Sequence, residues 1–188
     1  MKTIQFQFIG LISGLLLLMP HALADSIVEL GIHFGGDEVV QEPYTNGQID
    51  SIKAGELFSF DVGRLLSHSP NWESQITFGI KSDAKYDRDV EISWVRYPLN
   101  GIIFYRMQYM RVGVGATIHF SPKLQGGGHA GNVSEEYKNA PGGLLELDVI
   151  YNEKFLWGVR LTFIEYESTK TGRVIDGSSI GFLIIGQL

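Results

Sequence analysis

The sequence contains no cysteine and little basic charge. Among its 188 residues there are 15 Lys and Arg against 21 Asp and Glu, which gives a formal net charge of −6. Without cysteine, a disulfide scaffold, a thiolate metal site and a thiol nucleophile are all excluded. Because no Lys/Arg cluster is present to face a phosphate backbone, a nucleic-acid partner is not expected. The length favours a single domain.

The chain has only one extended apolar run, at its N-terminus. Residues 8–19 form this run, and it is shorter than the roughly 20 apolar residues that a transmembrane helix needs. A basic residue precedes it, and Ala22-Leu23-Ala24 matches the A-x-A pattern of a signal-peptidase site. We therefore predict a secretory signal peptide over residues 1–24 and one mature domain over residues 25–188.

What the chain has in abundance is glycine, with 23 residues, and aromatic side chains, at 12%. Apolar and polar residues alternate with a period of two and turn residues interrupt them, a pattern typical of β-strands and not of helices. The alternation predicts eight strands, over residues 26–35, 54–66, 72–82, 89–105, 111–121, 143–151, 155–166 and 178–188. Pro98 cannot donate a ladder hydrogen bond, so we expect a bulge or break beside it.

The connections between these strands alternate in length. Long connections are predicted at 36–53, 122–142 and 169–177, an intermediate one at 83–88, and short ones at 67–71, 107–110 and 152–154. Outer-membrane barrels have this asymmetry, with the long loops outside the cell. A soluble lipocalin-like barrel shows the same strand alternation with its apolar face turned inward, so that alternative stays open.

Side-chain distribution favours the membrane alternative. The polar face combines many glycines with charges of both signs, as the crowded lumen of a small barrel requires. Aromatic residues gather at the short-turn end, where an interfacial girdle would lie: Trp72, Tyr105, Tyr109, Tyr151 and Trp157. On the fourth strand, Ile92 and Trp94 fall on the apolar face. We predict an eight-stranded antiparallel up-and-down transmembrane β-barrel in the outer membrane of a Gram-negative bacterium.

The second half of the chain carries short motifs of a known group. Tyr97-Pro98-Leu99, the stretch at 113–123, and residues 160–166 followed by 176–179 resemble the strand and loop order of lipid A 3-O-deacylase-like barrels over residues 90–188. The resemblance implies a His-x-Ser pair on the penultimate strand and a Glu near the start of the last. The matching positions hold Glu165-Tyr166-Glu167 and Ser178-Ser179 instead, so the catalytic residues of that group are missing there.

One His-x-Ser pair occurs elsewhere, at His119 and Ser121. Alternation places both on one face, where an imidazole could activate the hydroxyl and Glu146 on the next strand could orient the imidazole. The structural interpretation, which we prefer, is that Ser121 begins a turn and His119 joins a hydrogen-bond network in the lumen. His33 and His119 share the polar face without a ligand spacing, so neither a metal site nor a cofactor is predicted.

The sequence thus favours a non-enzymatic outer-membrane barrel with a structural or loop-mediated binding role. Bulk diffusion is not expected, because an eight-stranded interior holds only side chains or one small ligand. A lipid A-modifying enzyme and a soluble periplasmic ligand-binding barrel are the alternatives. The predicted partners of this monomer are outer-membrane lipid and lipopolysaccharide. Acidic loop residues would either bind divalent cations or lipopolysaccharide, or simply be solvated: Asp37, Glu38, Glu42, Asp50, Glu135 and Glu136.

Overall fold

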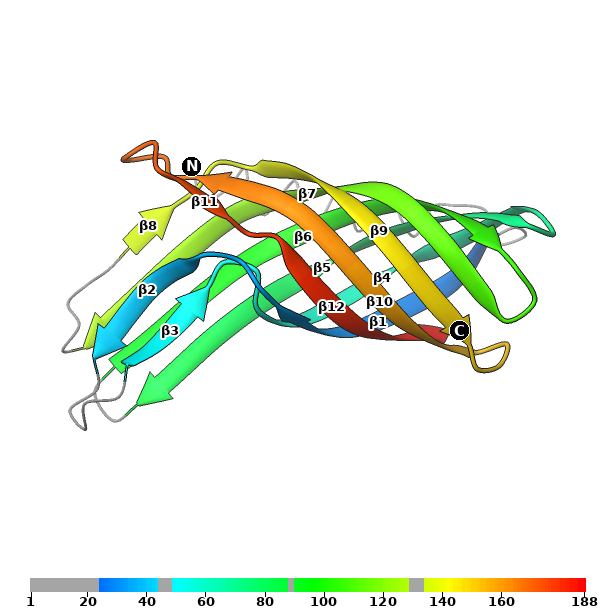
Figure 1. The fold of residues 1–188 in the computed structure, drawn as a ribbon, viewed down its shortest axis with the longest axis horizontal. Coiled ribbons are helices and arrows are strands. Elements are labelled where there is room, and N and C mark those ends of the chain that lie inside the picture. The colour runs from blue at the N-terminus through cyan, green and yellow to red at the C-terminus, as the bar shows by residue number, and fades with distance from the viewer. Residues whose placement is uncertain (1–23, 44–48, 88–89, 129–133) are drawn as a thin grey trace.

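The computed structural model describes residues 24–43, 49–87, 90–128 and 134–188, which form strands, turns and loops (Figure 1). Within these ranges no helix has the length and apolar character needed to cross a membrane. The strands are β1 (Ala24–Phe34), β2 (Glu38–Pro43), β3 (Ile49–Lys53), β4 (Leu57–Ser69), β5 (Trp72–Asp87), β6 (Val90–Arg106), β7 (Met110–Gly128), β8 (Ser134–Glu136), β9 (Ala140–Ile150), β10 (Phe155–Glu167), β11 (Val174–Asp176) and β12 (Ser179–Gln187).

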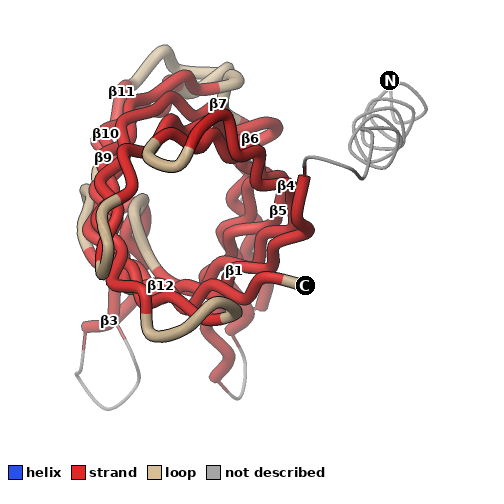
Figure 2. The backbone as a smooth tube through the Cα atoms, turned by 90° about the vertical axis from the view of Figure 1, so that its right-hand side faces the viewer, coloured by secondary structure: helices blue, strands red, loops and turns tan. Residues whose placement is uncertain are grey.

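Eight of these strands close into a barrel. Antiparallel pairing runs through β1, β4, β5, β6, β7, β9, β10 and β12 in turn. The ring closes where β12 pairs with β1, from Ile27 opposite Gln187 to Phe34 opposite Ile180. Figure 2 shows the closed ring seen from one end. The predicted eight-stranded antiparallel up-and-down barrel is confirmed.

The chain ends of the barrel and three tight turns lie at one end, which we call the short-turn end. These turns join β4 to β5, β6 to β7 and β9 to β10. The opposite, long-loop end carries the hairpin of β2 and β3, together with β8 and β11. Residues 1–23 of the predicted signal peptide lie outside the described residues, and its last residue, Ala24, is the first residue of β1.

Four predicted loops are in part strands. Those at 36–53 and 169–177 contain β2, β3 and β11, and those at 83–88 and 122–142 are shortened by strands of the barrel. The prediction of a loop at 83–88 is wrong for residues 83–87, which belong to β5. There β5 stays paired with β6, from Ser82 opposite Val95 to Asp87 opposite Val90. Likewise β7 continues through the three glycines at 126–128, which pair with the start of β6. An antiparallel ladder tolerates water on its faces, so nothing requires pairing to stop where the apolar band ends.

The ladder is interrupted beside Pro98, as predicted. Between β5 and β6, the pairing of Lys81 with Arg96 is followed by that of Phe78 with Leu99, and the residues between are unregistered. On its other side, β6 faces a bulge in β7, where the register shifts opposite Arg96. Ser121 lies in this bulge with φ of 47°, a left-handed conformation that few non-glycine residues adopt.

Side chains segregate by face as the alternation predicts. The apolar residues of the barrel strands point outward: Val114 is 62% exposed and Phe182 is 55% exposed. Most polar and charged strand residues point inward and are buried, including Glu29, Asp61 and Arg111. A contiguous apolar outer band around a polar interior is the arrangement of membrane barrels and the reverse of a soluble protein.

The prediction that Ile92 and Trp94 share the outward apolar face is wrong. Both are buried inside the long-loop end, where β6 rises past the apolar band and faces the connecting segments. There they belong to an apolar cluster, here called the mouth cluster. Its burial beneath the connecting segments is favourable because it removes apolar surface from water. The mouth cluster consists of Ile52, Ala54, Ile92, Trp94, Leu124, Tyr137, Ala140, Ile164, Tyr166 and Ile175.

Candidate functional site

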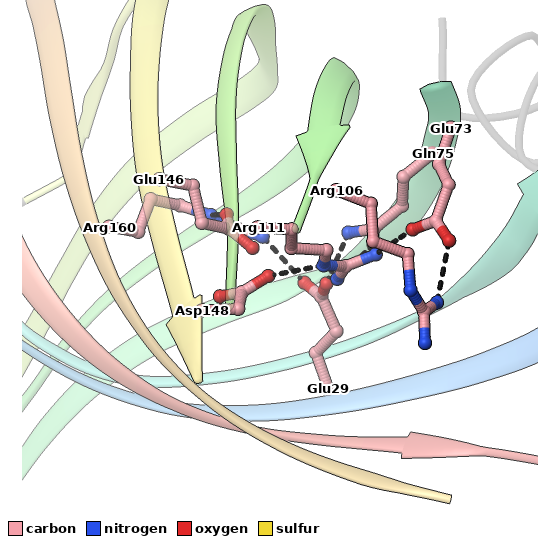
Figure 3. A network of polar contacts seen from close by, with 8 residues as sticks. All are labelled: Glu29, Glu73, Gln75, Arg106, Arg111, Glu146, Asp148 and Arg160. Carbon is pink, nitrogen blue, oxygen red and sulfur yellow. Dashed lines mark hydrogen bonds and ion pairs between the residues drawn. The ribbon is translucent and has the colours of Figure 1, made fainter. Parts of the chain in front are cut away.

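A network of charged side chains crosses the lumen near the short-turn end (Figure 3). Its members, here called the lumen network, are Glu29, Glu73, Gln75, Arg106, Arg111, Glu146, Asp148 and Arg160. Arg111 lies at its centre: Nε donates to Asp148 Oδ2 at 2.6 Å and Nη2 to Gln75 Oε1 at 2.9 Å. The guanidinium also stacks 3.9 Å from the ring centroid of Phe104.

Arg160 is the second hub of the network. Its Nη2 donates to Glu29 Oε2 at 2.9 Å and its Nε donates to a Glu146 carboxylate oxygen. The first contact connects β10 to β1, past the intervening β12, and the second connects β10 to its neighbour β9. Because the partners are all nearly fully buried, the carboxylates and guanidiniums depend on each other for the solvation that water would supply.

Glycines make room for this network. At Gly158 a Cβ atom would collide with Asp148 Oδ1, so the carboxylate occupies the space that a side chain on β10 would need. Gly113, inward-facing on β7, similarly lies against the ring of Phe104. The glycine-rich polar face therefore reflects close packing of large charged and aromatic side chains inside a narrow barrel.

Apolar side chains are also buried inside the barrel toward both ends. Near the short-turn end, Leu156, Leu183 and Ile185 are buried together inside the barrel. At the long-loop end, the mouth cluster covers the interior, and residues 52–56, here called the strap, cross it. Trp94 Nε1 donates to Ala54 O at 3.1 Å and Arg96 donates to Glu56 O, so two side chains of β6 hold the strap.

The three catalytic candidates are not brought together. His119 is buried and its Nδ1 is 2.6 Å from the Tyr166 hydroxyl. Ser121 lies in the β7 bulge, where its backbone N–H donates to Asn139 Oδ1 at 3.0 Å. Glu146 belongs to the lumen network and pairs with Gly113, six positions along β7 from His119, or about 20 Å at the rise of a strand. Glu146 therefore cannot orient the His119 imidazole.

Three residues that surround His119 were not predicted as site residues. Tyr166, Lys81 and Arg96 all point inward from predicted strands. Alternation gives their face, but the contact between His119 and Tyr166 joins β7 to β10, which are not neighbours in the barrel, and no local pattern encodes it. In the described part of the chain, no cluster of three His, Asp or Glu side chains could hold a metal ion.

Two of the acidic loop candidates contact other segments of the long-loop end. Asp37 Oδ2 accepts from the Asp176 backbone N–H at 3.0 Å, and Glu136 pairs with Lys123 at 3.2 Å. Burial raises the pKa of Tyr137, beside Glu135, to about 12, so its phenol stays neutral. The side chains of Glu42 and Asp50 lie outside the described residues.

Comparison with known proteins gives a match in structure only. No protein family matches the chain, and neither does any curated protein. Ail, the attachment invasion locus protein of Yersinia pestis, aligns with a TM-score of 0.55 at 11% identity, covering 87% of this chain and 96% of Ail. Neisserial surface protein A aligns with a TM-score of 0.56 at 6% identity, covering 88% and 97%. The resemblance to deacylase-like barrels stays a prediction. The chain has the fold of the small eight-stranded outer-membrane β-barrel proteins.

Proposed function

We propose that this protein is a non-enzymatic outer-membrane barrel that acts by binding at its long-loop end and does not conduct solutes. The observation that carries the proposal is the filled lumen. The lumen network spans the barrel, and apolar side chains are buried inside the barrel on both sides of it. An eight-stranded interior is only wide enough for such side chains, so the barrel serves as a scaffold.

The construction of the long-loop end supports a binding role. β5, β6 and β7 have 16, 17 and 19 residues, against 9 in β12, so these three strands extend beyond the rest of the barrel (Figure 1). The mouth cluster packs the connecting segments against these extensions. Loops held on a rigid scaffold are where binding residues concentrate.

Exposed carboxylates at this end suggest a ligand class. Glu165 and Asp176 face each other across β10 and β11, and both are exposed. With a net charge of −6, direct binding of a polyanion is unfavourable. This differs from Ail, which has been solved with the heparin analogue sucrose octasulfate and aligns at 12% identity over 88% of this chain and 98% of that one, with a TM-score of 0.55. We propose that lipopolysaccharide phosphates bind here through bridging divalent cations, which bind oxygen ligands.

Fractionation and bilayer recordings test the barrel and its closed lumen. The mature protein should sediment with outer membranes and change gel mobility on boiling, because a closed barrel has no strand edge where detergent can begin to separate it. In planar bilayers it should give no steady conductance. Recovery in the soluble periplasm would refute the membrane location, and a steady ohmic current would refute the closed lumen.

Binding at the long-loop end is tested with purified lipopolysaccharide. We expect protein in micelles to bind it in the presence of Mg²⁺ and to lose it on addition of EDTA. The double variant Glu165→Gln/Asp176→Asn should weaken this binding, whereas Glu153→Gln, an exposed change at the short-turn end, should not. Equal binding by both variants would refute the assignment of the ligand to this surface.

The enzymatic alternative has its own test. Expression of the protein should leave the mass spectrum of lipid A unchanged. If lipid A were shortened, and if Ser121→Ala abolished the shortening, the non-enzymatic proposal would be wrong. The soluble lipocalin-like alternative is not supported, because the apolar side chains face outward from the barrel.

A further inference from the structure

Two basic side chains face each other inside the barrel on the long-loop side of the lumen network. Lys81 on β5 and Arg96 on β6 are direct cross-strand partners, and they are 4% and 0% exposed. Like charges directly opposite on one face of a sheet repel each other. A buried charge is also costly unless it is paired and hydrogen-bonded. This juxtaposition needs a compensating group.

Neither side chain forms an ion pair within the described residues. Lys81 Nζ donates to the Ser179 hydroxyl at 3.2 Å, which leaves two of its three N–H groups for other acceptors. Arg96 donates from Nη2 to Glu56 O in the strap. Its Nε and Nη1 atoms are buried without a hydrogen-bond partner. Leaving a buried donor unsatisfied carries the full desolvation penalty of that group.

Two carboxylates lie near this pair of basic residues. Asp61 and Asp83 are buried on β4 and β5, and Asp61 accepts from Asn100 Nδ2 at 3.4 Å. Asp61 makes no ion pair with Lys81 or Arg96, in contrast to the lumen network, where Arg111 and Arg160 bind carboxylates directly. The two carboxylates moderate the positive charge, and the Nε and Nη1 atoms of Arg96 still lack a hydrogen-bond acceptor.

The position is enclosed by the features that close the long-loop end. Trp94 lies with its ring centroid 5.3 Å from the Arg96 guanidinium carbon, and the strap crosses the same end. A ligand held here would be separated from bulk water by the strap and by the mouth cluster. Low local polarity strengthens any charge-assisted hydrogen bond that such a ligand accepts.

We propose that a small inorganic oxyanion, of the size and charge of phosphate or sulfate, binds between Arg96 and Lys81. The oxyanion would accept hydrogen bonds from the unpartnered guanidinium N–H groups and from the Lys81 ammonium. Both groups are standard partners of phosphate oxygens. It would also convert two repelling cations into a bridge across the interrupted β5 and β6 ladder beside Pro98. This site is internal and does not depend on binding at the long-loop rim.

The test uses the mature protein refolded into micelles, with inorganic phosphate present during refolding so that enclosure does not prevent entry. We expect a single phosphate per chain in ³¹P NMR and a higher unfolding temperature than after refolding in chloride of equal ionic strength. Lys81→Gln and Arg96→Gln should each weaken phosphate binding by about tenfold or more. Lys123→Gln, a change at a partly exposed lysine, is the matched control and should bind phosphate as the wild type does.

The results that overturn the proposal are distinct. Absence of bound phosphate in the wild type would mean that water alone serves the Arg96 donors. Equal binding by Lys81→Gln, or equal stabilisation by chloride, would indicate an adventitious ion only. Lys81→Gln keeps a donor for Ser179 and removes the repulsion, so in phosphate-free buffer it should unfold no earlier than the wild type. Should that variant not fold, Lys81→Met removes the same charge and is tested for phosphate binding in its place.

Discussion

Replacing Arg160 by Met is the sharpest test of the lumen network. Arg160 is 3% exposed and binds two carboxylates that come from different strands, Glu29 and Glu146. Met keeps much of the volume of the side chain and removes both ion pairs. The two carboxylates then remain buried beside Asp148, with Arg111 as the nearest remaining guanidinium of the network.

The expected cost follows from this geometry. Breaking a buried pair by removing one partner destabilises a protein by about 3–5 kcal/mol, because an uncompensated charge stays behind. Lys138 and Glu167 make an ion pair at the long-loop end with an N–O distance of 2.6 Å, but their side chains are 57% and 44% exposed. Removing that pair with Lys138→Met should cost at most about 1 kcal/mol. Comparison of the two variants therefore shows how burial changes the contribution of an ion pair to the free energy of unfolding.

The free energy of unfolding can be measured by urea titration of protein folded in lipid vesicles, followed by tryptophan fluorescence. Adding Glu146→Gln to Arg160→Met should recover at least about 1 kcal/mol, because the second change removes one of the abandoned charges. If Arg160→Met unfolded at the same urea concentration as Lys138→Met, the lumen network would not be a stabilising unit and the reasoning would be refuted.

Three further predictions concern the faces, the orientation and the mouth. Arg in place of Val114, which is 62% exposed, should destabilise the barrel by about 2–4 kcal/mol if it lies near the bilayer midplane, whereas the inward change Thr117→Ser should be nearly silent in the same urea titration. A cysteine at Thr171 should react with an impermeant maleimide on intact cells and one at Asn152 should not; equal labelling would mean that the orientation is wrong. Trp94→Ala should cost about 3–5 kcal/mol by emptying the centre of the mouth cluster, where Trp94 packs edge-on against Tyr137 and Tyr166, and should make the strap sensitive to protease. Unchanged proteolysis would argue against a role of this cluster in holding the strap.

The barrel was predictable because its pattern is local. Each strand carries a two-residue alternation, and turn residues mark its ends, so eight strands and their outward faces follow from the sequence. The alternation does not say where the membrane ends. Ile92 and Trp94 have the same local pattern as lipid-facing residues, yet they lie inside because β6 extends past the apolar band into the mouth cluster.

The interior was predictable in kind and not in detail. The two-residue alternation correctly places charges of both signs on the inward face. Which charges pair depends on barrel geometry: Arg160 and Glu29 are 131 residues apart in the chain and on strands separated by β12. The hypothesis that joined His119, Ser121 and Glu146 relied on their strands being neighbours. It did not take account of how far along each strand the residue lies. The register of β7 and β9 places Glu146 at the level of the lumen network instead.

The seam between β1 and β12 sets the order in which this protein can assemble. Every other junction joins two barrel strands that are consecutive in the chain, whereas this one joins the first barrel strand to the last. A nascent barrel therefore has two open edges until residues 179–187 have been synthesised and delivered. In hydrocarbon those edges would carry unsatisfied backbone groups, so insertion before closure is strongly disfavoured. Such long-range pairing is slow to form. The predicted export of this chain would therefore have to keep it unfolded, or supply a temporary partner for the edges, until the seam can close.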